Sequence, residues 1–413
     1  MTWIEEATHK LLWHAARIAS RRVITRFDRF ASEEPRHAAL LSYLVLPLLP
    51  FPDIGSRSLF NNWSIAREIP RALNQLGYAV DIVNYDNISW TPSRRYDLFI
   101  GHGGINFERL SRLIHPDAVR IYFSTGIYWR ELNARLAARI KELALRKRCA
   151  LPLYRSVSVD EEYANAVSDG IICLGNHAAA RTYSKFPLVA TINNLIPDVH
   201  SDDFEDKDYG EARKHFLFFS GPGNVLKGLD LLLEIFSRTD LHLHVCQHVE
   251  PSFGRIYHRE LTQLPNIHVH GVIAMRSLTF RSLISRCNWI ISATCTEGQP
   301  GAVLECMAHG LIPILPITAN IDLEEWGILL PNIEPNTILS AIIRASEMTA
   351  DECGRRAVSV MKKTRMIYSI DNFRLNFQMA VRSILEVVDS RDIGPNELIP
   401  IDSTLGSHQV PAK

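Results

Sequence analysis

Residues 296–316, TEGQPGAVLECMAHGLIPILP, place two glutamates on either side of the expected start of a helix. Glu297 opens a turn rich in glycine and proline, and Glu305 follows eight positions later inside an apolar helical segment. Pro300 sets φ just before the helix, and Gly310 suits the left-handed residue that follows its last turn. An apolar strand pattern comes next, so the stretch predicts a turn, a helix and a buried strand.

The preceding segment, NWIISATCT (288–296), has the pattern of a buried strand. In an open α/β sheet, ligands bind beyond the carboxyl ends of the strands. Gly298 and Gly301 let a ligand approach the backbone closely, and the free N–H groups at a helix start attract anions. Helical side chains lean toward the N-terminus, so Glu305 is expected to face the same site. Carboxylate oxygens there are suited to sugar hydroxyls.

A second element, SGPGNVLKGLDLLLEIF, spans residues 220–236. Ser220 and Gly221 end a strand pattern, while Lys227 and Gly228 directly precede a helical one. A lysine in this place can neutralise a diphosphate, helped by the helix dipole. The phosphate-loop pattern G-x-x-x-x-G-K-S/T is absent. Taken alone, the pattern is a weak signal, and an ordinary surface lysine before a helix is its usual explanation.

Strand and helix patterns alternate along most of the chain, which predicts an α/β fold with two doubly wound, Rossmann-like domains. An acidic stretch poor in large apolar residues separates the two series and predicts a linker. The predicted units are an N-terminal amphipathic helix (1–37), an N-terminal Rossmann-like domain (38–196), the acidic linker (197–213), a C-terminal Rossmann-like domain (214–366), a crossover helix (367–390) and a flexible tail (391–413).

The composition is that of a soluble globular protein, with 46% apolar and 22% charged residues in 413. Basic and acidic residues number 45 each, so no net charge favours nucleic acid as a partner. The seven cysteines form no C-x-x-C pair, which indicates reduced thiols in a cytoplasmic protein. Charges throughout the first twenty residues argue against a secretory signal.

Residues 3–31 show apolar residues at helical spacing and predict one long helix. Its basic residues are Lys10, Arg17, Arg21, Arg22, Arg26 and Arg29. A helix packed on the first domain, with a solvated basic side, is the favoured interpretation. The alternative is peripheral contact with an anionic membrane, at its inner face.

Three segments in this order, SGPGNVLKGLDLLLEIF, IHVHGVI and TEGQPGAVLECMAHGLIPIL, resemble the C-terminal half of the retaining family 4 (group 1) glycosyltransferases of GT-B fold. The resemblance is clear over about 215–330, and the spacing from Glu297 to Glu305 matches the E-x7-E signature of that family. It implies a nucleotide-diphosphate sugar held mainly by the C-terminal domain, without a metal. It also implies a glycan, lipid or small-molecule acceptor held mainly by the N-terminal domain.

The resemblance also implies roles for single residues. Lys227 would meet the diphosphate, Glu305 would bind the ribose hydroxyls, and Glu297 would face the transferred sugar. His102 ends a strand pattern of the N-terminal domain and would lie near the reacting sugar, although a structural histidine is equally expected there. The further donor-binding positions are Gly221, Gln299, Pro300, Gly301, Ala302 and Gly298, with Gly271 and Val272 near the base.

One position departs from the family pattern. Many members carry an arginine just after the glycine that ends the strand, and this chain has Pro222. Lys227 would then carry more of the charge compensation on the diphosphate. Three hypotheses remain: transfer of a sugar with retention, a GT-B enzyme that epimerises nucleotide sugars, and a catalytically silent binding subunit.

Overall fold

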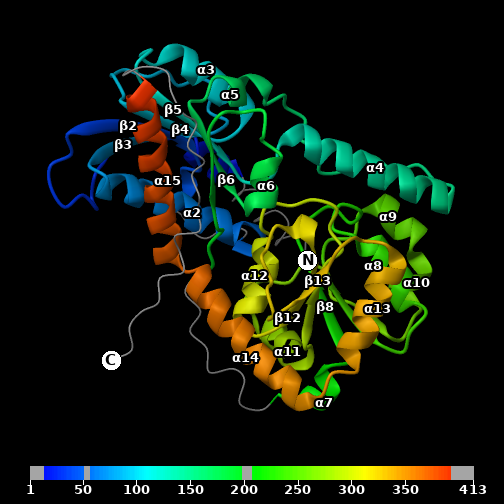
Figure 1. Cartoon of the computed structure of the whole chain (residues 1–413). Helices are drawn as coiled ribbons and strands as arrows, with labels where there is room; N and C mark the ends of the chain where they lie inside the picture. The colour runs from blue at the N-terminus through cyan, green and yellow to red at the C-terminus, as the bar shows by residue number, and fades with distance from the viewer. Residues whose placement is uncertain (1–13, 51–55, 198–206, 392–413) are drawn as a thin grey trace, which may run out of the picture.

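The computed structural model describes residues 14–50, 56–197 and 207–391. These residues form two lobes, each built around one sheet of mainly parallel strands with helices on both faces (Figure 1). We call them the N-terminal and C-terminal lobes. The α/β class and the two doubly wound sheets that the alternating pattern predicts are confirmed.

The N-terminal lobe contains a seven-stranded sheet with the order β1-β3-β2-β4-β5-β6-β7. Only β1 is antiparallel to its neighbour, β3. Its strands are β1 (Ile24–Phe27), β2 (His37–Tyr43), β3 (Tyr78–Asn84), β4 (Leu98–Gly101), β5 (Val119–Ser124), β6 (Gly170–Leu174) and β7 (Val189–Ile192). The strand order reverses between β2 and β4.

The C-terminal lobe contains a six-stranded sheet with the order β10-β9-β8-β11-β12-β13, parallel throughout. Its strands are β8 (His215–Phe219), β9 (His242–Cys246), β10 (Ile267–Val269), β11 (Trp289–Ile291), β12 (Ile312–Pro316) and β13 (Ile328–Leu330). The order reverses between β8 and β11, and ligands of open α/β sheets bind at such a reversal.

The helices complete both lobes. Their bounds are η1 (Leu46–Leu48), α2 (Ser56–Gln75), α3 (Gly104–Leu113), α4 (Trp129–Lys147), α5 (Glu162–Ala166), α6 (His177–Arg181), α7 (Tyr209–Ala212), α8 (Leu229–Phe236), α9 (Pro251–Ile256), α10 (His258–Thr262), α11 (Leu278–Arg286), α12 (Gly301–Ala308), η2 (Ile317–Ala319), α13 (Pro335–Ser346), α14 (Ala350–Ile367) and α15 (Ile370–Arg391). No helix in the described ranges is both long and apolar enough to cross a bilayer.

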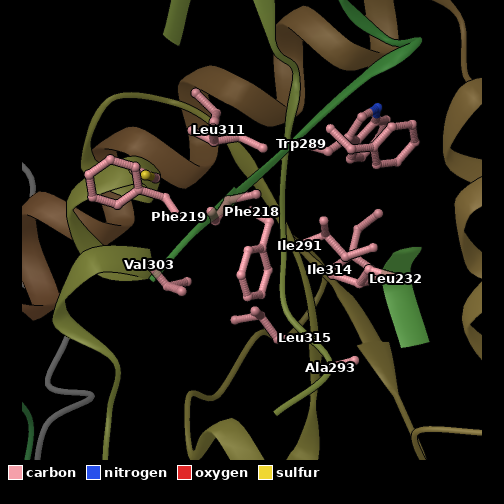
Figure 2. Packing of buried hydrophobic residues seen from close by; sticks show 14 of the residues in the cluster. Phe218, Phe219, Leu232, Trp289, Ile291, Ala293, Val303, Leu311, Ile314 and Leu315 are labelled. Atoms are coloured by element: carbon pink, nitrogen blue, oxygen red, sulfur yellow. The ribbon is translucent and has the colours of Figure 1, made fainter. Parts of the chain in front are cut away.

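The core of the C-terminal lobe lies on both faces of its sheet. Phe218 and Ile291 from neighbouring strands point into the packed interior, with Leu315 beside them (Figure 2). Trp289 is fully buried, and its indole N–H donates to the carbonyl oxygen of Arg213 at 2.9 Å. Burial of both faces explains why these strands are continuous apolar runs, as parallel strands covered by helices require.

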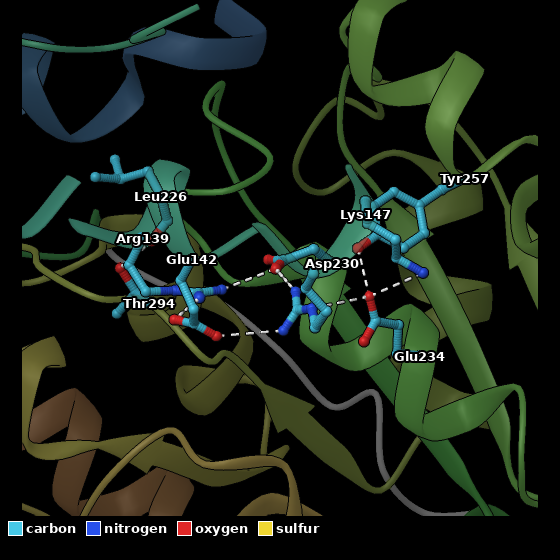
Figure 3. A network of polar contacts seen from close by, with 9 residues as sticks. Arg139, Glu142, Lys147, Leu226, Asp230, Glu234, Tyr257 and Thr294 are labelled. Atoms are coloured by element: carbon cyan, nitrogen blue, oxygen red, sulfur yellow. Dashed lines mark hydrogen bonds and ion pairs between the residues drawn. The ribbon is translucent and has the colours of Figure 1, made fainter. Parts of the chain in front are cut away.

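Two helices tie the lobes together (Figure 1). Helix α4 follows β5 of the N-terminal lobe, yet Leu136 and Leu143 on it belong to the core of the C-terminal lobe. Its Arg139 and Arg146 both donate to Asp230 on α8, at 2.8 and 2.7 Å (Figure 3). In the opposite direction, α15 returns from the C-terminal lobe and packs against α2, burying Phe377 in the N-terminal core.

The predicted helix over residues 3–31 is wrong in its second half. Residues 14–19 are helical, but 24–27 form β1, which pairs with β3. Arg26 has a φ of 49°, and its N–H donates to Asp81 Oδ1 at 2.7 Å. This contact with the sheet overrides the helical periodicity. The basic residues of this stretch that the structure describes therefore do not share one helical face, and peripheral membrane contact stays a prediction.

Several predicted segments lie outside the described residues. They are residues 1–13, the tail from 392 and most of the acidic linker, 198–206. The end of that linker forms the short helix α7, whose start is capped by Asp208 through N–H donation from Gly210 and Glu211.

Five histidines form a stack across the sheet. They lie on β8, on β9, on β10 and just after β10. His244 Nε2 lies 3.0 Å from His215 Nδ1, and His244 Nδ1 lies 3.1 Å from His270 Nε2. In a further contact of the same kind, His242 Nδ1 lies 3.1 Å from His268 Nε2. In the described part of the chain, no group of three or more His, Cys, Asp or Glu side chains is arranged to hold a metal ion.

The histidine stack predicts loss of stability in acid. Burial and the neighbouring histidines lower the pKa of His244 to about 2, whereas the unfolded chain has a pKa near 6.5. The unfolded state therefore binds the proton at a higher pH than the folded state does. As a result, the free energy of unfolding falls as the pH is lowered below about 6.5. At pH 5 this one residue should cost about 2 kcal/mol relative to pH 7.5.

Urea unfolding at both pH values measures this effect. His244→Gln cannot titrate and should show a smaller drop in the midpoint between pH 7.5 and pH 5 than the unchanged protein. The exposed His258→Gln serves as the control, with an unaltered drop. An equal drop in all three proteins would exclude His244 as its source.

Candidate functional site

The turn of residues 292–301 begins earlier than the sequence pattern indicates. Strand β11 ends at Ile291, and 292–296 run as a loop. The reason is a set of bonds to the neighbouring loop after β8: Cys295 N–H and the Thr294 hydroxyl both donate to Leu226 O, at 3.0 and 3.1 Å. These bonds hold the two sequence stretches together at the reversal between β8 and β11.

The loop after β8 has a conformation that only glycine permits at one position. Gly228 has a φ of 78°, and a Cβ there would lie 2.2 Å from Ala293 O. Earlier in the same loop, the backbone N–H groups of Gly223 and Asn224 donate to Oε1 of Glu250, which follows β9, at 3.0 and 2.9 Å. The loop is therefore fixed from both sides, and Lys227 projects from a rigid support.

Lys227 and Glu297 are in contact in the structure. The Nζ atom of Lys227 pairs with Oε1 of Glu297, and both side chains are largely buried. Burial lowers the pKa of the Lys227 ammonium, and the positive charge of Arg155 lowers it further. The adjoining Glu297 carboxylate acts in the opposite sense, by favouring the charged amine. A cation and an anion thus stand side by side at the end of the sheet.

Glu305 is 1% exposed and lies near the middle of α12. Arg276 Nε donates to Glu305 Oε1 at 2.8 Å, and Arg276 Nη2 donates to Pro197 O at 3.1 Å. The second carboxylate oxygen, Oε2, is buried and has no hydrogen-bond partner among the described residues. A buried acceptor left without a donor is costly, so this oxygen marks a place for a polar ligand group.

The glycines of the turn lie against the N-terminal lobe. A Cβ at Gly298 would stand 2.6 Å from Thr125 O, which follows β5. A Cβ at Gly301 would stand 2.3 Å from the side chain of Asn61 on α2. Backbone approach explains both glycines, and in the structure the approaching group is the other lobe.

Gln299 joins the lobes through its side chain as well as its backbone. Its Oε1 accepts from Asn194 N–H at 2.7 Å, and its Nε2 donates to Asn193 Oδ1 at 2.8 Å. Its carbonyl oxygen accepts from Asn194 Nδ2 at 2.9 Å. Gln299 is expected from the sequence as a donor-binding position, and its side-chain contact with the N-terminal lobe is not part of that expectation.

His102 lies at the reversal point of the N-terminal sheet. The backbone N–H of His102 donates to Ser42 O at 3.0 Å, and the ring atom Nδ1 lies 3.0 Å from Phe123 O. A carbonyl partner requires Nδ1 to carry the proton, which leaves Nε2 as an acceptor in the neutral ring. Phe123 is two residues before Thr125, which touches Gly298. His102 is therefore anchored to the strand whose end meets the turn of the C-terminal lobe.

The remaining predicted positions fall into two groups. Pro300 and Ala302 stand at the start of α12, with Pro300 as its N-cap residue, and Gly221 follows β8 with open space where a side chain would be. Gly271 has a φ of 70°, and Val272 is 52% exposed. These two follow β10, which is separated from β8 by β9.

Several residues of the site have no counterpart in the sequence analysis. Asn193 and Asn194 follow β7, and Glu250 follows β9, so polar residues after a buried strand pattern are the signal that could reveal them. Arg276 and Arg155 stand in irregular segments without such a signal.

No protein-family model and no curated protein matches this chain. Solved structures do. Sucrose-phosphate synthase from Thermosynechococcus elongatus has a TM-score of 0.55 at 14% identity, over 86% of this chain and 100% of that one. HepE from Anabaena, solved with UDP and glucose, has a TM-score of 0.53 at 12% identity, over 86% of this chain and 99% of that one.

TarM from S. aureus, solved as a variant with UDP, Fondaparinux and alpha-GlcNAc-glycerol, has a TM-score of 0.50 at 15% identity. That match covers 68% of this chain and 55% of TarM, so the chain spans about half the length of that relative. At such identities the similarity concerns the fold. The chain has a GT-B fold, and the resemblance to retaining family 4 glycosyltransferases is confirmed at that level.

Proposed function

We propose that this chain is a glycosyltransferase that moves a sugar from a nucleotide-diphosphate sugar to an acceptor with retention of anomeric configuration. The observation that supports this most is the contact between Lys227 and Glu297 at the reversal between β8 and β11. A donor of this class needs a cation for its diphosphate and an acceptor of hydrogen bonds for its sugar hydroxyls. The pair offers both at one point.

Donor binding would rearrange the charges of this pair. A diphosphate competes with Glu297 for the Lys227 ammonium, and the released carboxylate can then accept hydrogen bonds from the sugar. The N–H groups at the start of α12 add a positive potential next to the phosphates. Oε2 of Glu305, which is buried without a partner among the described residues, would accept a bond from a ribose hydroxyl.

The chemical step in this proposal breaks the bond between the anomeric carbon and the phosphate oxygen. The bond from the acceptor oxygen forms on the same face, and the departing phosphate takes the acceptor proton. Negative charge grows on the phosphate, where Lys227 and the α12 N-terminus are fixed in place to stabilise it. In our proposal these groups supply the counter-charge, so no cofactor is required.

The acceptor would bind to the N-terminal lobe. His102 is held at the carboxyl end of β4, and its Nε2 is left to accept a hydrogen bond from the reacting sugar or the acceptor. A glycan, a lipid or a small molecule would each present the hydroxyl that the reaction needs.

A panel of nucleotide sugars tests the proposal. Binding of one of them should raise the melting temperature. Incubation of that donor with candidate acceptors should then give transfer or slow hydrolysis, with the released sugar in its original anomeric configuration. Conversion of the donor into its epimer without an acceptor would replace the proposal with an epimerase, and absence of any nucleotide binding would replace it with a binding subunit.

Glu305→Gln should weaken binding of the donor by about tenfold or more, because a hydrogen bond to a charged group contributes about 1.5–3 kcal/mol. Glutamine keeps the shape of the side chain and a carbonyl oxygen for Arg276, so the fold is preserved better than with alanine. Isothermal calorimetry measures the affinity. The exposed Glu347→Gln is the matched control, and equal affinity in both variants would refute the role of Glu305.

A further inference from the structure

The loop after β8 contains one cation for a ligand that carries at least two negative charges. Residues 220–228 read SGPGNVLKG, with Lys227 as the sole basic residue. Pro222 occupies the position at which an arginine would have supplied a second. A diphosphate held by one partly neutralised ammonium would be poorly compensated, because Lys227 also pairs with Glu297.

A second cation reaches this loop from the N-terminal lobe. Arg155 lies in the segment between α4 and α5, and its Cγ would be 3.2 Å from a Cβ at Gly223. The side chain is exposed, and it makes no ion pair or hydrogen bond with any residue that the structure describes. Its positive charge is close enough to Lys227 to lower the pKa of that amine.

The segment that carries Arg155 is held in place relative to the Lys227 loop. Asn133 on α4 exchanges two hydrogen bonds with Val157, at 2.9 and 2.8 Å. Helix α4 itself is fixed to α8 by the bonds from Arg139 and Arg146 to Asp230 (Figure 3). Helix α8 begins directly after the Lys227 loop. Arg155 also adopts a φ of 74°, a conformation that a non-glycine residue takes only when its surroundings impose it.

Two cations that face each other without a shared anion repel, and an anion placed between them removes that cost. Gly221 leaves open space on the same loop, where a side chain would otherwise stand. A guanidinium offers a planar fork of donors that matches phosphate oxygens, which a single ammonium cannot do.

We propose that Arg155 is the second cation of the diphosphate site and that the N-terminal lobe contributes it in place of the arginine absent at Pro222. This inference rests on the proposed function. It makes the diphosphate a bridge between the lobes, since Lys227 and Arg155 belong to different ones.

The test compares Arg155→Gln, Arg155→Lys and Arg148→Gln by calorimetry with UDP, GDP and ADP and with the corresponding nucleosides. Arg148 is the control because it is also exposed and left-handed, with a φ of 51°. For the diphosphate that the unchanged protein binds, Arg155→Gln should lose about tenfold or more in affinity. Lysine should restore part of it, and the control should bind normally. Affinity for the nucleoside should be the same in all proteins.

Unchanged diphosphate affinity in Arg155→Gln would overturn the inference while leaving the proposed function intact. Equal losses for diphosphate and nucleoside would also overturn it, because they would indicate a structural role. If the unchanged protein binds none of these diphosphates and none of the nucleotide sugars in the panel, the proposed function fails, and the assignment of Arg155 fails with it.

Discussion

Replacing Lys227 with methionine is expected to lower kcat/KM for sugar transfer by about a hundredfold to a thousandfold, the range seen when one fixed electrostatic donor is removed from a reacting site. Methionine retains most of the buried volume of the side chain, so packing under the loop is preserved. The loss follows from the proposed function, in which the ammonium of Lys227, next to Glu297 in the structure, stabilises the phosphate oxygen that gains charge.

Two further variants separate this effect from others. Lys214 directly precedes β8, at the end of the strand opposite the Lys227 loop, and pairs with Glu211 at 2.8 Å. Lys214→Met should therefore leave activity intact. Lys227→Met together with Glu297→Gln removes the carboxylate that the single change leaves unpaired. The double variant should regain stability but not activity. A single variant with more than half of the original kcat/KM would refute the proposed role of Lys227.

Asp230→Asn is expected to lower the free energy of unfolding by about 3–5 kcal/mol, the cost of leaving buried charges without their partner. Asp230 is fully buried and accepts from Arg139 and Arg146 (Figure 3). Burial raises the pKa of Asp230, and the two arginines act against that rise. Asparagine removes the charge and leaves the largely buried Arg139 without its main counter-ion inside the protein.

Glu142→Gln is the matched control for this prediction. Glu142 contacts the same two arginines, but its side chain is 52% exposed. Exposed ion pairs contribute about 1 kcal/mol or less, so the urea midpoint of this variant should barely move. Similar midpoints for Asp230→Asn and Glu142→Gln would show that the pair between α4 and α8 does not hold the lobes together.

The sequence predicts the two lobes because buried parallel strands and amphipathic helices have different periods along the chain. Glu297 is predicted because it follows an apolar strand pattern, and Glu305 because helical side chains lean toward the start of their helix. The role of Lys227, and the specific roles of both glutamates, come from the family resemblance and stay predictions. Lys227 meets Glu297 because β8 pairs with β11. The periodicity within each segment does not reveal the order of the strands in the sheet.

The failures have a common physical origin in contacts between distant segments. The helical pattern of residues 24–27 gives way to a strand because Arg26 bonds to Asp81. The histidines form a stack because the register sets His244 beside His268, which no single segment reveals. Arg155 reaches the loop after β8 from another lobe, so no spacing within either stretch indicates it.

The most direct test of the account is a crystal structure of the protein with the nucleoside diphosphate that raises its melting temperature most. We expect the phosphates within hydrogen-bond distance of Lys227 Nζ and the ribose hydroxyls within hydrogen-bond distance of Glu305 Oε2. A nucleotide bound away from both side chains would contradict the account.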